Sequence, residues 1–474
     1  MILKNGAHIH LIAACGTGMG SLAIMLQQRG FRITGSDSNV YAPMSTYLRD
    51  IGIKLIEGFS ASNITKDIDL VVIGNAVSRG NPELEATLDS SIPYSSMPEM
   101  LRDYFISGLH SIVISGTHGK TTTTAIMAHL FYHAGLDPSF FIAGIPNNFD
   151  HSHRLGAGKH FIIEGDEYDS AYFAKWSKFF YYLPQTLVIN NIEFDHADIF
   201  AELADIIRSF RYLVNTVPGS GLIVANSDDK SVKEVIKSSH TPVQTFGLES
   251  NAYWQGYEIK TTTTGTNFKV MREQKNYGDF WIPLHGVFNV RNAIAAIAVG
   301  NSAGIGENEI KNGLATFKGV KRRQELLGVW NNIVVIDDFA HHPTAVENTL
   351  VAIREAYPQH RLWALFEPAS STNSRAIFED DYFRALSIAS NIVVGQVPRP
   401  ERARMDTPFV PNRLVEKLKA IGKYAWHFDH SDQICTHLSK NTQSGDVVLF
   451  LSNGGFSGIQ QAFIKTLKSS HEND

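Results

Sequence analysis

The stretch that most limits the fold of this chain is residues 110–125, HSIVISGTHGKTTTTA. An apolar run typical of a buried strand leads into a glycine turn, and Lys-Thr then opens a segment with helical spacing. This order is typical of α/β folds, in which parallel strands end at one edge of a sheet and helices return the chain. At that edge the N–H groups of the turn and of the helix N-terminus can bind phosphate.

The turn departs from the general phosphate-loop spacing. That pattern requires a glycine five residues before Gly119, where this chain has Ile114, and the glycine stands at Gly116 instead. The flanking strand and helix nevertheless favour phosphate binding over the alternative, a helix start capped by threonines. Lys120 would bring a positive charge to the phosphates, and Thr121 would offer a hydroxyl to Mg²⁺.

The length and the pattern of apolar runs predict about three α/β domains. The first, residues 1–107, reads as a Rossmann-like domain with a strand, a glycine turn, a helix and further strands. The second, residues 108–325, contains the phosphate turn and a mostly parallel sheet, and its residues 251–284 alternate as antiparallel hairpins do. The third, residues 326–474, again reads as Rossmann-like.

Composition excludes several classes of function. The net charge is −5, so nothing indicates bulk attraction to nucleic acid or to anionic lipid. No apolar run approaches the roughly 20 residues of a membrane span. The chain has two cysteines, which fits reduced thiols in the cytoplasm better than a disulfide framework. We therefore expect a cytoplasmic protein that acts on small molecules, and the oligomeric state is not indicated.

The motif GTHGKTTT resembles the ATP loop of the Mur ligases, the amide-forming enzymes of bacterial cell-wall precursors, and the resemblance covers essentially the whole chain. It implies ATP as cosubstrate, Mg²⁺ as cofactor, and a UDP-sugar in the first domain. The residues of the turn that it assigns to ATP are Gly116, Thr117, His118, Gly119, Lys120, Thr121 and Thr122.

Five further motifs narrow the resemblance to one branch of the family. DSNVYAPMST, IGNAVSRGNPELEA, NNIEFDHADIF, DDFAHHPTAV and LSNGGFSGIQQ are most similar to the branch that joins UDP-N-acetylmuramate to L-alanyl-γ-D-glutamyl-meso-diaminopimelate, which reuses cell-wall peptide. The close alternative is the branch that adds L-alanine to the same UDP-sugar. In both, the carboxylate would be activated as an acyl phosphate before the amine attacks.

The motif IIEGDEYDSAYF places four carboxylates just after a predicted strand: Glu164, Asp166, Glu167 and Asp169. A solvated acidic loop is the plain alternative, but the position near the phosphate turn favours Mg²⁺, which prefers carboxylates together with phosphates and water. The resemblance selects Glu164 with Thr121 as metal ligands. It also implies that His196 helps to hold a second Mg²⁺ at the acceptor carboxylate, and it makes Lys120, Glu164 and His196 the catalytic residues.

Further nucleotide contacts come from three motifs. Asn289 and Asn292 stand in GVFNVRNAIAA, where an amide could read an adenine edge or cap the helix, and the resemblance selects adenine. Arg322 and Arg323, in a basic cluster that would otherwise be a solvated face, become candidates to clamp a phosphate or the acyl phosphate. Asp337 would meet the ribose side of the nucleotide and His341 the nucleotide itself.

The first domain carries CGTGMGS, in which Ser21 stands where a dinucleotide fingerprint requires glycine or alanine. Because Asp37 ends the second strand, a nicotinamide site is a competitor. The resemblance places a UDP-sugar there instead. The residues that it assigns to this substrate are Gly16, Thr17, Gly18, Met19, Asp37, Asn75 and Ser78. The candidates for contacts with the peptide carboxylates are Arg375, Arg399, Arg402 and Arg404.

Two functions of other classes compete with a ligase. A phosphate-loop regulatory ATPase would hydrolyse ATP without a sugar nucleotide, and it gives the Asp-His motif of the third domain no role. A nicotinamide-dependent oxidoreductase built on the first domain would leave the phosphate turn unexplained.

Overall fold

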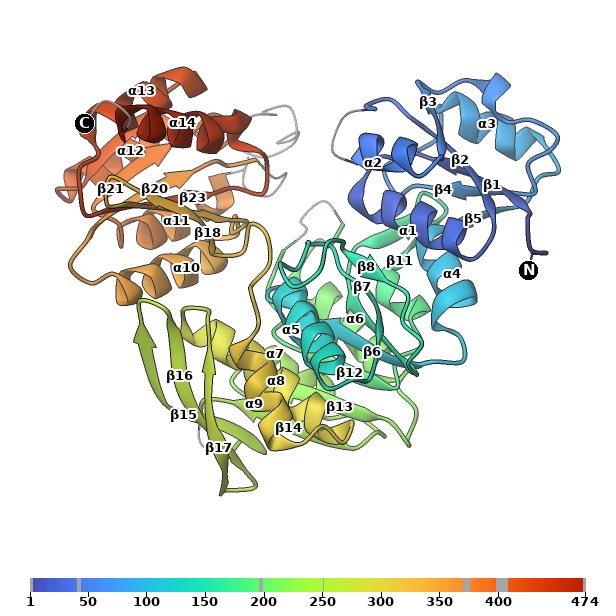
Figure 1. The fold of residues 1–474 in the computed structure, drawn as a ribbon, viewed down its shortest axis with the longest axis horizontal. Coiled ribbons are helices and arrows are strands. Elements are labelled where there is room, and N and C mark those ends of the chain that lie inside the picture. The colour runs from blue at the N-terminus through green and yellow to red at the C-terminus, as the bar shows by residue number, and fades with distance from the viewer. Residues whose placement is uncertain are drawn as a thin grey trace. The chain divides into compact units, whose positions relative to one another are not determined.

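A computed structural model describes residues 3–40, 44–195, 199–249, 251–369, 376–397 and 408–471 (Figure 1). The chain forms two compact units. Unit 1 comprises Met1–Glu193, Ala204–Phe246 and Ala295–Ile310, and unit 2 comprises Phe194–Leu203, Gly247–Ile294 and Lys311–Asp474. The domain boundaries predicted near residues 107 and 325 stay predictions.

The first sheet of unit 1 is five-stranded and parallel, with the order β3-β2-β1-β4-β5. The order reverses between β1 and β4, and open α/β sheets bind ligands at the carboxyl ends of strands beside such a switch point. The strands are β1 (His8–Ile12), β2 (Arg32–Asp37), β3 (Lys54–Glu57), β4 (Leu70–Ile73) and β5 (Tyr94–Ser96). The helices are α1 (Thr17–Gln28), α2 (Met44–Asp50), α3 (Pro82–Asp89) and α4 (Met97–Leu101), with the short turns η1 (Ala61–Asn63) and η2 (Arg102–Ile106).

The part of the second sheet that lies in unit 1 has the strand order β14-β13-β12-β6-β9-β7-β8, and every neighbouring pair in it except β7–β8 is parallel. Its strands β6, β9 and β12 are almost wholly buried, which explains their continuous apolar sequences. The strands are β6 (His110–Ser115), β7 (Ser139–Phe141), β8 (His153–Arg154), β9 (His160–Gly165), β12 (Thr186–Ile189), β13 (Leu222–Asn226) and β14 (Val243–Gly247).

Helices and a small hairpin connect these strands (Figure 1). The phosphate turn leads from β6 directly into α5. The helices are α5 (Lys120–His133), α6 (Leu203–Val214) and α7 (Lys230–Ile236), and α8 (Val287–Ser302) and α9 (Glu307–Ala315) follow later in the chain. The hairpin strands are β10 (Asp169–Ala171) and β11 (Ala174–Ser177), followed by η3 (Lys178–Tyr181).

Unit 2 contains an antiparallel meander and a six-stranded sheet. The meander is β15 (Trp254–Thr262), β16 (Gly265–Arg272) and β17 (Lys275–Ile282), so the hairpins predicted for residues 251–284 are confirmed. The sheet has the order β18-β19-β23-β20-β21-β22, in which only β18 is antiparallel. Its strands are β18 (Glu325–Trp330), β19 (Ile333–Asp338), β20 (Arg361–Phe366), β21 (Asn391–Val394), β22 (Tyr424–His427) and β23 (Asp446–Leu451).

Helices lie on both faces of this sheet and bury two apolar layers against it. The helices are α10 (Pro343–Ala356), α11 (Glu379–Leu386), α12 (Pro411–Ala420), α13 (Ser431–Asn441) and α14 (Ile459–His471), with the short turns η4 (Ala376–Phe378) and η6 (Phe456–Gly458). The α/β class with parallel sheets predicted from the sequence is therefore confirmed for both units.

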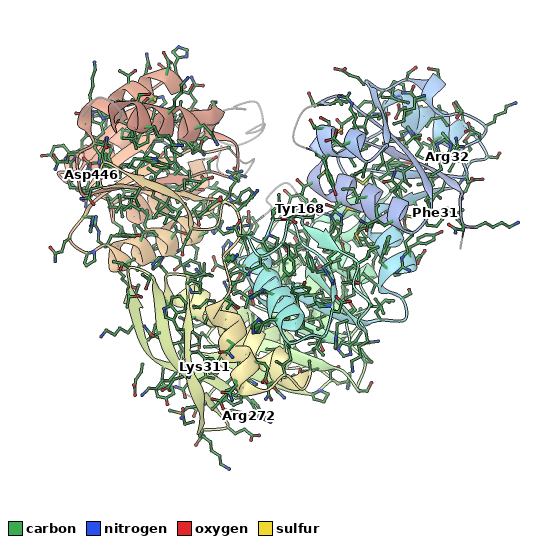
Figure 2. The ribbon with its side chains drawn as sticks, in the orientation of Figure 1. Phe31, Arg32, Tyr168, Arg272, Lys311 and Asp446 are labelled. Carbon is green, nitrogen blue, oxygen red and sulfur yellow. The ribbon has the colours of Figure 1, made fainter. Side chains whose placement is uncertain are left out.

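A buried carboxylate, Asp446, lies at the start of β23 (Figure 2). The guanidinium of Arg361 donates to its two oxygens at 2.8 and 2.7 Å, and the indole N–H of Trp363 donates at 2.9 Å. Trp363 also stacks on Trp426, with ring centroids 5.8 Å apart and planes at 13°. Since these donors satisfy the charge, this cluster pins the amino ends of β20 and β23 together.

Cys15 and Cys435 are both free thiols. Among the residues that the structure describes, no helix is long and apolar enough to cross a membrane.

Candidate active site

The phosphate turn of unit 1 depends on two glycines. Gly116 has φ +134°, and a Cβ there would lie 3.0 Å from Cβ of Asn190 and from backbone atoms of Asn191. Gly119 is left-handed at φ +82° and caps the start of α5. Both positions therefore require glycine, the first because of crowding as well as conformation.

Two asparagines at the end of β12 hold the turn in place. The N–H of Thr117 donates to the carbonyl of Asn191 at 3.0 Å, and the N–H of His118 donates to its side-chain oxygen at 2.7 Å. The Asn190 amide donates to the hydroxyl of Thr123 on α5 at 3.0 Å. The sequence motif VINNI contains both asparagines, but sequence reasoning gave them no role.

Lys120, the first residue of α5, folds back over the turn. Its ammonium donates to the carbonyl of Gly116 at 2.7 Å and to the two carboxylate oxygens of Glu167 at 2.8 and 3.0 Å. Burial acts to lower the pKa of Lys120, but Glu167, followed by Asp166, outweighs it and holds that pKa above its ordinary value. The side chain therefore stays charged at neutral pH, as a phosphate contact requires.

Thr121 and Glu164 come from separate motifs and meet in the structure. The Thr121 hydroxyl donates to one oxygen of Glu164 at 2.9 Å, and the N–H of Ala143 donates to the other at 2.7 Å. Both side chains are buried. A hydroxyl and a carboxylate beside a phosphate turn are the oxygen donors that Mg²⁺ takes in nucleotide sites, so these residues fit the metal that the sequence predicts.

The other carboxylates of the same motif are paired with lysines. Asp166 accepts from Lys178 at 2.7 Å, and Asp169 accepts from Lys175 at 2.5 Å. The four acidic residues thus have distinct contacts, and Glu167 contacts Lys120 itself. Sequence reasoning placed Glu167 among the four but did not predict that pairing.

Two of the predicted site residues, His196 and Arg375, lie outside the described residues. The further peptide candidates Arg399, Arg402 and Arg404 lie outside them as well. Their predicted roles stay predictions.

The glycine turn of the first sheet is ordered by Asp37 at the end of β2. One carboxylate oxygen of Asp37 accepts the N–H of Cys15 at 2.8 Å, and the other accepts the N–H of Asn39 at 3.0 Å. Gly16 caps α1, which begins at Thr17, so the N–H groups of the turn and of Gly18 and Met19 lie at a helix N-terminus. Burial, with the charge of Asp37 as the second cause, raises the pKa of the Cys15 thiol to about 11.

Ser21, the departure from the dinucleotide fingerprint, has a structural partner. Its hydroxyl hydrogen-bonds the hydroxyl of Ser152 at 2.8 Å, and both residues are buried. Ser152 precedes β8 of the second sheet, so this bond links the helix of the first turn to the sheet that carries the second. A glycine or alanine at position 21 could not make it.

Asn75 and Ser78 lie exposed in the loop between β4 and α3, as a substrate contact requires. Glu83, from the same motif, is fully buried and accepts from Ser36 and from Asn63. Burial acts to raise the pKa of Glu83, but the hydrogen bonds from His10, Ser36 and Asn63 lower it overall. This end of the motif therefore supports the loop from inside the sheet.

In unit 2, Asn289 and Asn292 lie on one face of α8 and are in contact. The Asn292 amide donates to the Asn289 side-chain oxygen at 3.1 Å, and the Asn289 amide donates to the His285 carbonyl at 2.9 Å. Both are buried. The Asn289 amide thus donates to a carbonyl, whereas a helix cap would accept a backbone N–H, and the adenine role stays a prediction.

Arg322 and Asp337 join the ends of two strands of the unit 2 sheet. The Arg322 guanidinium lies 3.3 Å from an oxygen of Asp337 and donates to the carbonyl of Ser452 at 2.5 Å. Burial raises the pKa of Asp337, against the opposing effect of Arg322. These contacts give Arg322 a structural function, and its predicted phosphate contact is untested.

Two further predicted nucleotide residues lie around Phe339. The Arg323 guanidinium is 4.7 Å from the centre of the Phe339 ring, and the His341 ring nitrogen Nδ1 is 3.1 Å from the Phe339 carbonyl. Asp338 accepts the N–H of Ala340 at 2.7 Å, and burial raises its pKa to about 6. The structure thus gathers these residues at the carboxyl end of β19, where α/β sheets bind ligands.

Comparison with family models gives three matches along the chain. Residues 8–106 match "Mur ligase family, catalytic domain", residues 114–300 match "Mur ligase middle domain", and residues 322–454 match "Mur ligase, glutamate ligase domain".

Two curated relatives span almost the full length. The UDP-N-acetylmuramate–L-alanyl-γ-D-glutamyl-meso-2,6-diaminoheptandioate ligase of Escherichia coli is 38% identical over 98% of this chain and 99% of its own. The UDP-N-acetylmuramate–L-alanine ligase of Acetivibrio thermocellus is 33% identical over 97% of this chain and 96% of its own.

Two solved structures are similar over 98% of this chain and 99% of theirs. A murein peptide ligase from Psychrobacter arcticus is 33% identical with a TM-score of 0.73. A UDP-N-acetylmuramate–alanine ligase from Thermotoga maritima is 25% identical with a TM-score of 0.82.

Proposed function

The chain belongs to the Mur ligase family, and from that premise we propose that it joins UDP-N-acetylmuramate to the tripeptide L-alanyl-γ-D-glutamyl-meso-diaminopimelate, with ATP as cosubstrate. The observation that supports this choice is the identity over nearly full length, 38% to a ligase named for that peptide against 33% to one named for L-alanine. Because ATP and UDP-sugars are cytoplasmic metabolites, we place the protein in the cytoplasm.

The first step is phosphoryl transfer. The muramate carboxylate attacks the γ-phosphorus of ATP, the bond to the bridging oxygen of ADP breaks, and an acyl phosphate and ADP result. Lys120 and the N–H groups at the N-terminus of α5 face the phosphates and stabilise the charge that develops on their oxygens. His196 would orient the carboxylate, which is the role that the family motif implies for it.

Thr121 and Glu164 are the residues that would hold Mg²⁺. The ion neutralises charge on the phosphate oxygens when it is bound. Their contact at 2.9 Å supports this assignment, since the two oxygens already face one another beside Lys120.

The second step forms the amide. The free amine of the peptide attacks the acyl carbon, a tetrahedral intermediate forms, and inorganic phosphate leaves as the amine loses a proton. The protein contributes by holding the amine against the acyl phosphate, an entropic gain, and by keeping water away from it. Arg375 is our candidate for a contact with a peptide carboxylate.

The second candidate function is ligation of L-alanine to the same UDP-sugar. The observation that favours it is the TM-score of 0.82 to the Thermotoga maritima enzyme, higher than the 0.73 to the murein peptide ligase. We prefer the tripeptide because a TM-score reports the backbone, whereas the choice of amine depends on side chains, which sequence identity follows more closely.

A competition decides between the two amines. The protein is given ATP, Mg²⁺ and UDP-N-acetylmuramate with equal concentrations of L-alanine and tripeptide, and the products are identified by mass. We expect the tripeptide product to dominate. A product with L-alanine alone would contradict the proposal in favour of the second candidate.

Two controls test the rival classes. ADP release without UDP-N-acetylmuramate and amine would indicate a regulatory ATPase. Reduction of a nicotinamide cofactor would indicate an oxidoreductase, although both oxygens of Asp37 already accept backbone N–H groups.

A further inference from the structure

The Lys120 ammonium, which the proposed function assigns to the ATP phosphates, is already engaged by protein oxygens. It contacts the carbonyl of Gly116 and both carboxylate oxygens of Glu167, all within 3.0 Å. The Glu167 side chain is 2% exposed and that of Lys120 is 14% exposed. A phosphate group must therefore share or replace the contact of a buried carboxylate in order to reach this lysine.

Negative charge exceeds positive charge among the side chains around the turn. The carboxylates of Glu164, Asp166 and Glu167 all act on Lys120, and a second ammonium, that of Lys178, is paired with Asp166. Bringing a polyanion to buried carboxylates is costly unless a cation offsets them. A divalent cation, bound together with the nucleotide, would reverse this balance.

Each carboxylate of the motif has a separate contact, which identifies the one that competes for the lysine. Asp166 faces Lys178, Asp169 faces Lys175, and Glu164 faces the Thr121 hydroxyl. Glu167, which precedes Tyr168 (labelled in Figure 2) in the segment between β9 and β10, contacts the Lys120 ammonium with both oxygens. Neither the family motif nor the comparisons assign a function to this carboxylate.

We propose that Glu167 is a positioning residue that competes with the nucleotide's phosphates for the Lys120 ammonium and so makes ATP binding depend on a divalent cation. This inference rests on the proposed function, because it takes the turn to be the ATP site. Glu167 acts through Lys120 and need not touch the reacting atoms. Its effect is selective: it disfavours ATP without a metal more than it disfavours Mg·ATP.

The test is a pair of ATP-binding titrations on the full chain without acceptor substrates, one with excess Mg²⁺ and one with EDTA. We expect the wild type to bind metal-free ATP at least about tenfold more weakly than Mg·ATP. In Glu167→Gln, which keeps the size of the side chain and removes its charge, the affinity for metal-free ATP should rise about tenfold, while that for Mg·ATP should change less than about threefold.

Asp169→Asn is the matched control, because it removes one negative charge from the same segment, on a carboxylate whose partner Lys175 is 68% exposed. The ratio of the two affinities should stay at the wild-type value in this control. Glu167→Asp keeps the charge and should keep most of the cation dependence. Melting temperatures of all variants check that a changed ratio does not come from misfolding.

Each outcome bears on one of the two claims. If the wild type binds both forms of ATP equally, or if Glu167→Gln keeps the wild-type ratio, the inference about Glu167 is overturned. The inference is also overturned if Asp169→Asn or Glu167→Asp lowers the ratio of the affinities for Mg·ATP and metal-free ATP as far as Glu167→Gln does. If Lys120→Ala binds Mg·ATP as tightly as the wild type, the turn is not the ATP site and the proposed function itself fails.

Discussion

The two glycine turns of unit 1 have the same backbone plan and very different surroundings. One follows β1 and opens α1, and the other follows β6 and opens α5, so each presents N–H groups at a helix N-terminus. At the first turn, Gly16 has φ −69° and a Cβ would meet nothing within 4 Å. At the second, Gly116 has φ +134° and a Cβ would meet three atoms at 3.0 Å.

The two turns also differ in the side chains that surround them. The first turn is ordered by one carboxylate, Asp37, which accepts two backbone N–H groups. The second has a largely enclosed ammonium, Lys120, between the turn and Glu167, with the Thr121–Glu164 pair beside it. If the proposed function holds, backbone N–H groups alone would bind the diphosphate of the UDP-sugar at the first turn, whereas phosphoryl transfer at the second turn would also need enclosed charged side chains. Four predictions test this difference.

The largest effect is expected for Lys120→Ala. Ligation should fall by about a thousandfold or more, because the developing charge on the transferred phosphate loses the ammonium that the proposed function assigns to it. Product formation by mass and UDP-N-acetylmuramate binding by calorimetry measure the two turns separately. Binding of the UDP-sugar should be unchanged. Loss of ligation together with loss of UDP-sugar binding would contradict the assignment of the two substrates to separate turns.

Alanine at the two glycines should act unequally. Gly116→Ala introduces both strain and crowding, so we expect the free energy of unfolding to fall by about 2 kcal/mol and ATP affinity to fall about a hundredfold. Gly16→Ala should change the free energy of unfolding by less than about 0.5 kcal/mol, because its conformation and space admit a methyl group. Chemical denaturation and ATP titration compare the two variants. Equal losses of stability and of ATP affinity in both variants would contradict the expected difference between the turns.

Asp37→Ala should loosen the first turn alone. Two backbone N–H groups lose their acceptor, so UDP-N-acetylmuramate affinity should fall about tenfold while ATP affinity stays at the wild-type value. Asp37→Asn, which keeps one oxygen acceptor, should retain part of the affinity. A nicotinamide cofactor that bound the wild type and not Asp37→Ala would point to the competing function instead.

The smallest effect is expected for Ser21→Ala. The buried bond to Ser152 is lost, and the free energy of unfolding should fall by about 1 kcal/mol. Ser152→Ala should cost about the same, and the double variant should cost much less than the sum, since both remove one bond. Additive losses would show that the two hydroxyls are not coupled.

Much of the fold follows from local sequence patterns. Runs such as those of β6 and β9 are continuously apolar because both faces are buried, and the alternation of residues 251–284 marks an antiparallel meander. The meeting of Thr121 with Glu164 was also predictable in kind, because the carboxyl ends of neighbouring parallel strands share one edge of the sheet.

The contacts that sequence reasoning missed depend on tertiary register. The pairing of Glu167 with Lys120 joins residues 47 positions apart, and nothing in a run of four carboxylates says which of them faces the lysine. Arg322 reaches Ser452 across 130 positions, so its basic cluster read only as a solvated face or a phosphate clamp. Sequence reasoning did not identify the strand β18, antiparallel at the edge of the sheet: four of its six residues are apolar, but Glu325 and Gly328 interrupt the run and all six residues are at least partly exposed.

The stacked pair of Trp363 and Trp426 belongs to an uneven distribution of tryptophans, which has a practical consequence for fluorescence spectroscopy. Of the six tryptophans in the chain, five (Trp254, Trp281, Trp330, Trp363 and Trp426) belong to unit 2, and only Trp176 belongs to unit 1. Intrinsic fluorescence will therefore report mainly on the melting of unit 2. A Trp176→Phe variant would remove the tryptophan of unit 1, so that the fluorescence would follow the melting of unit 2 alone.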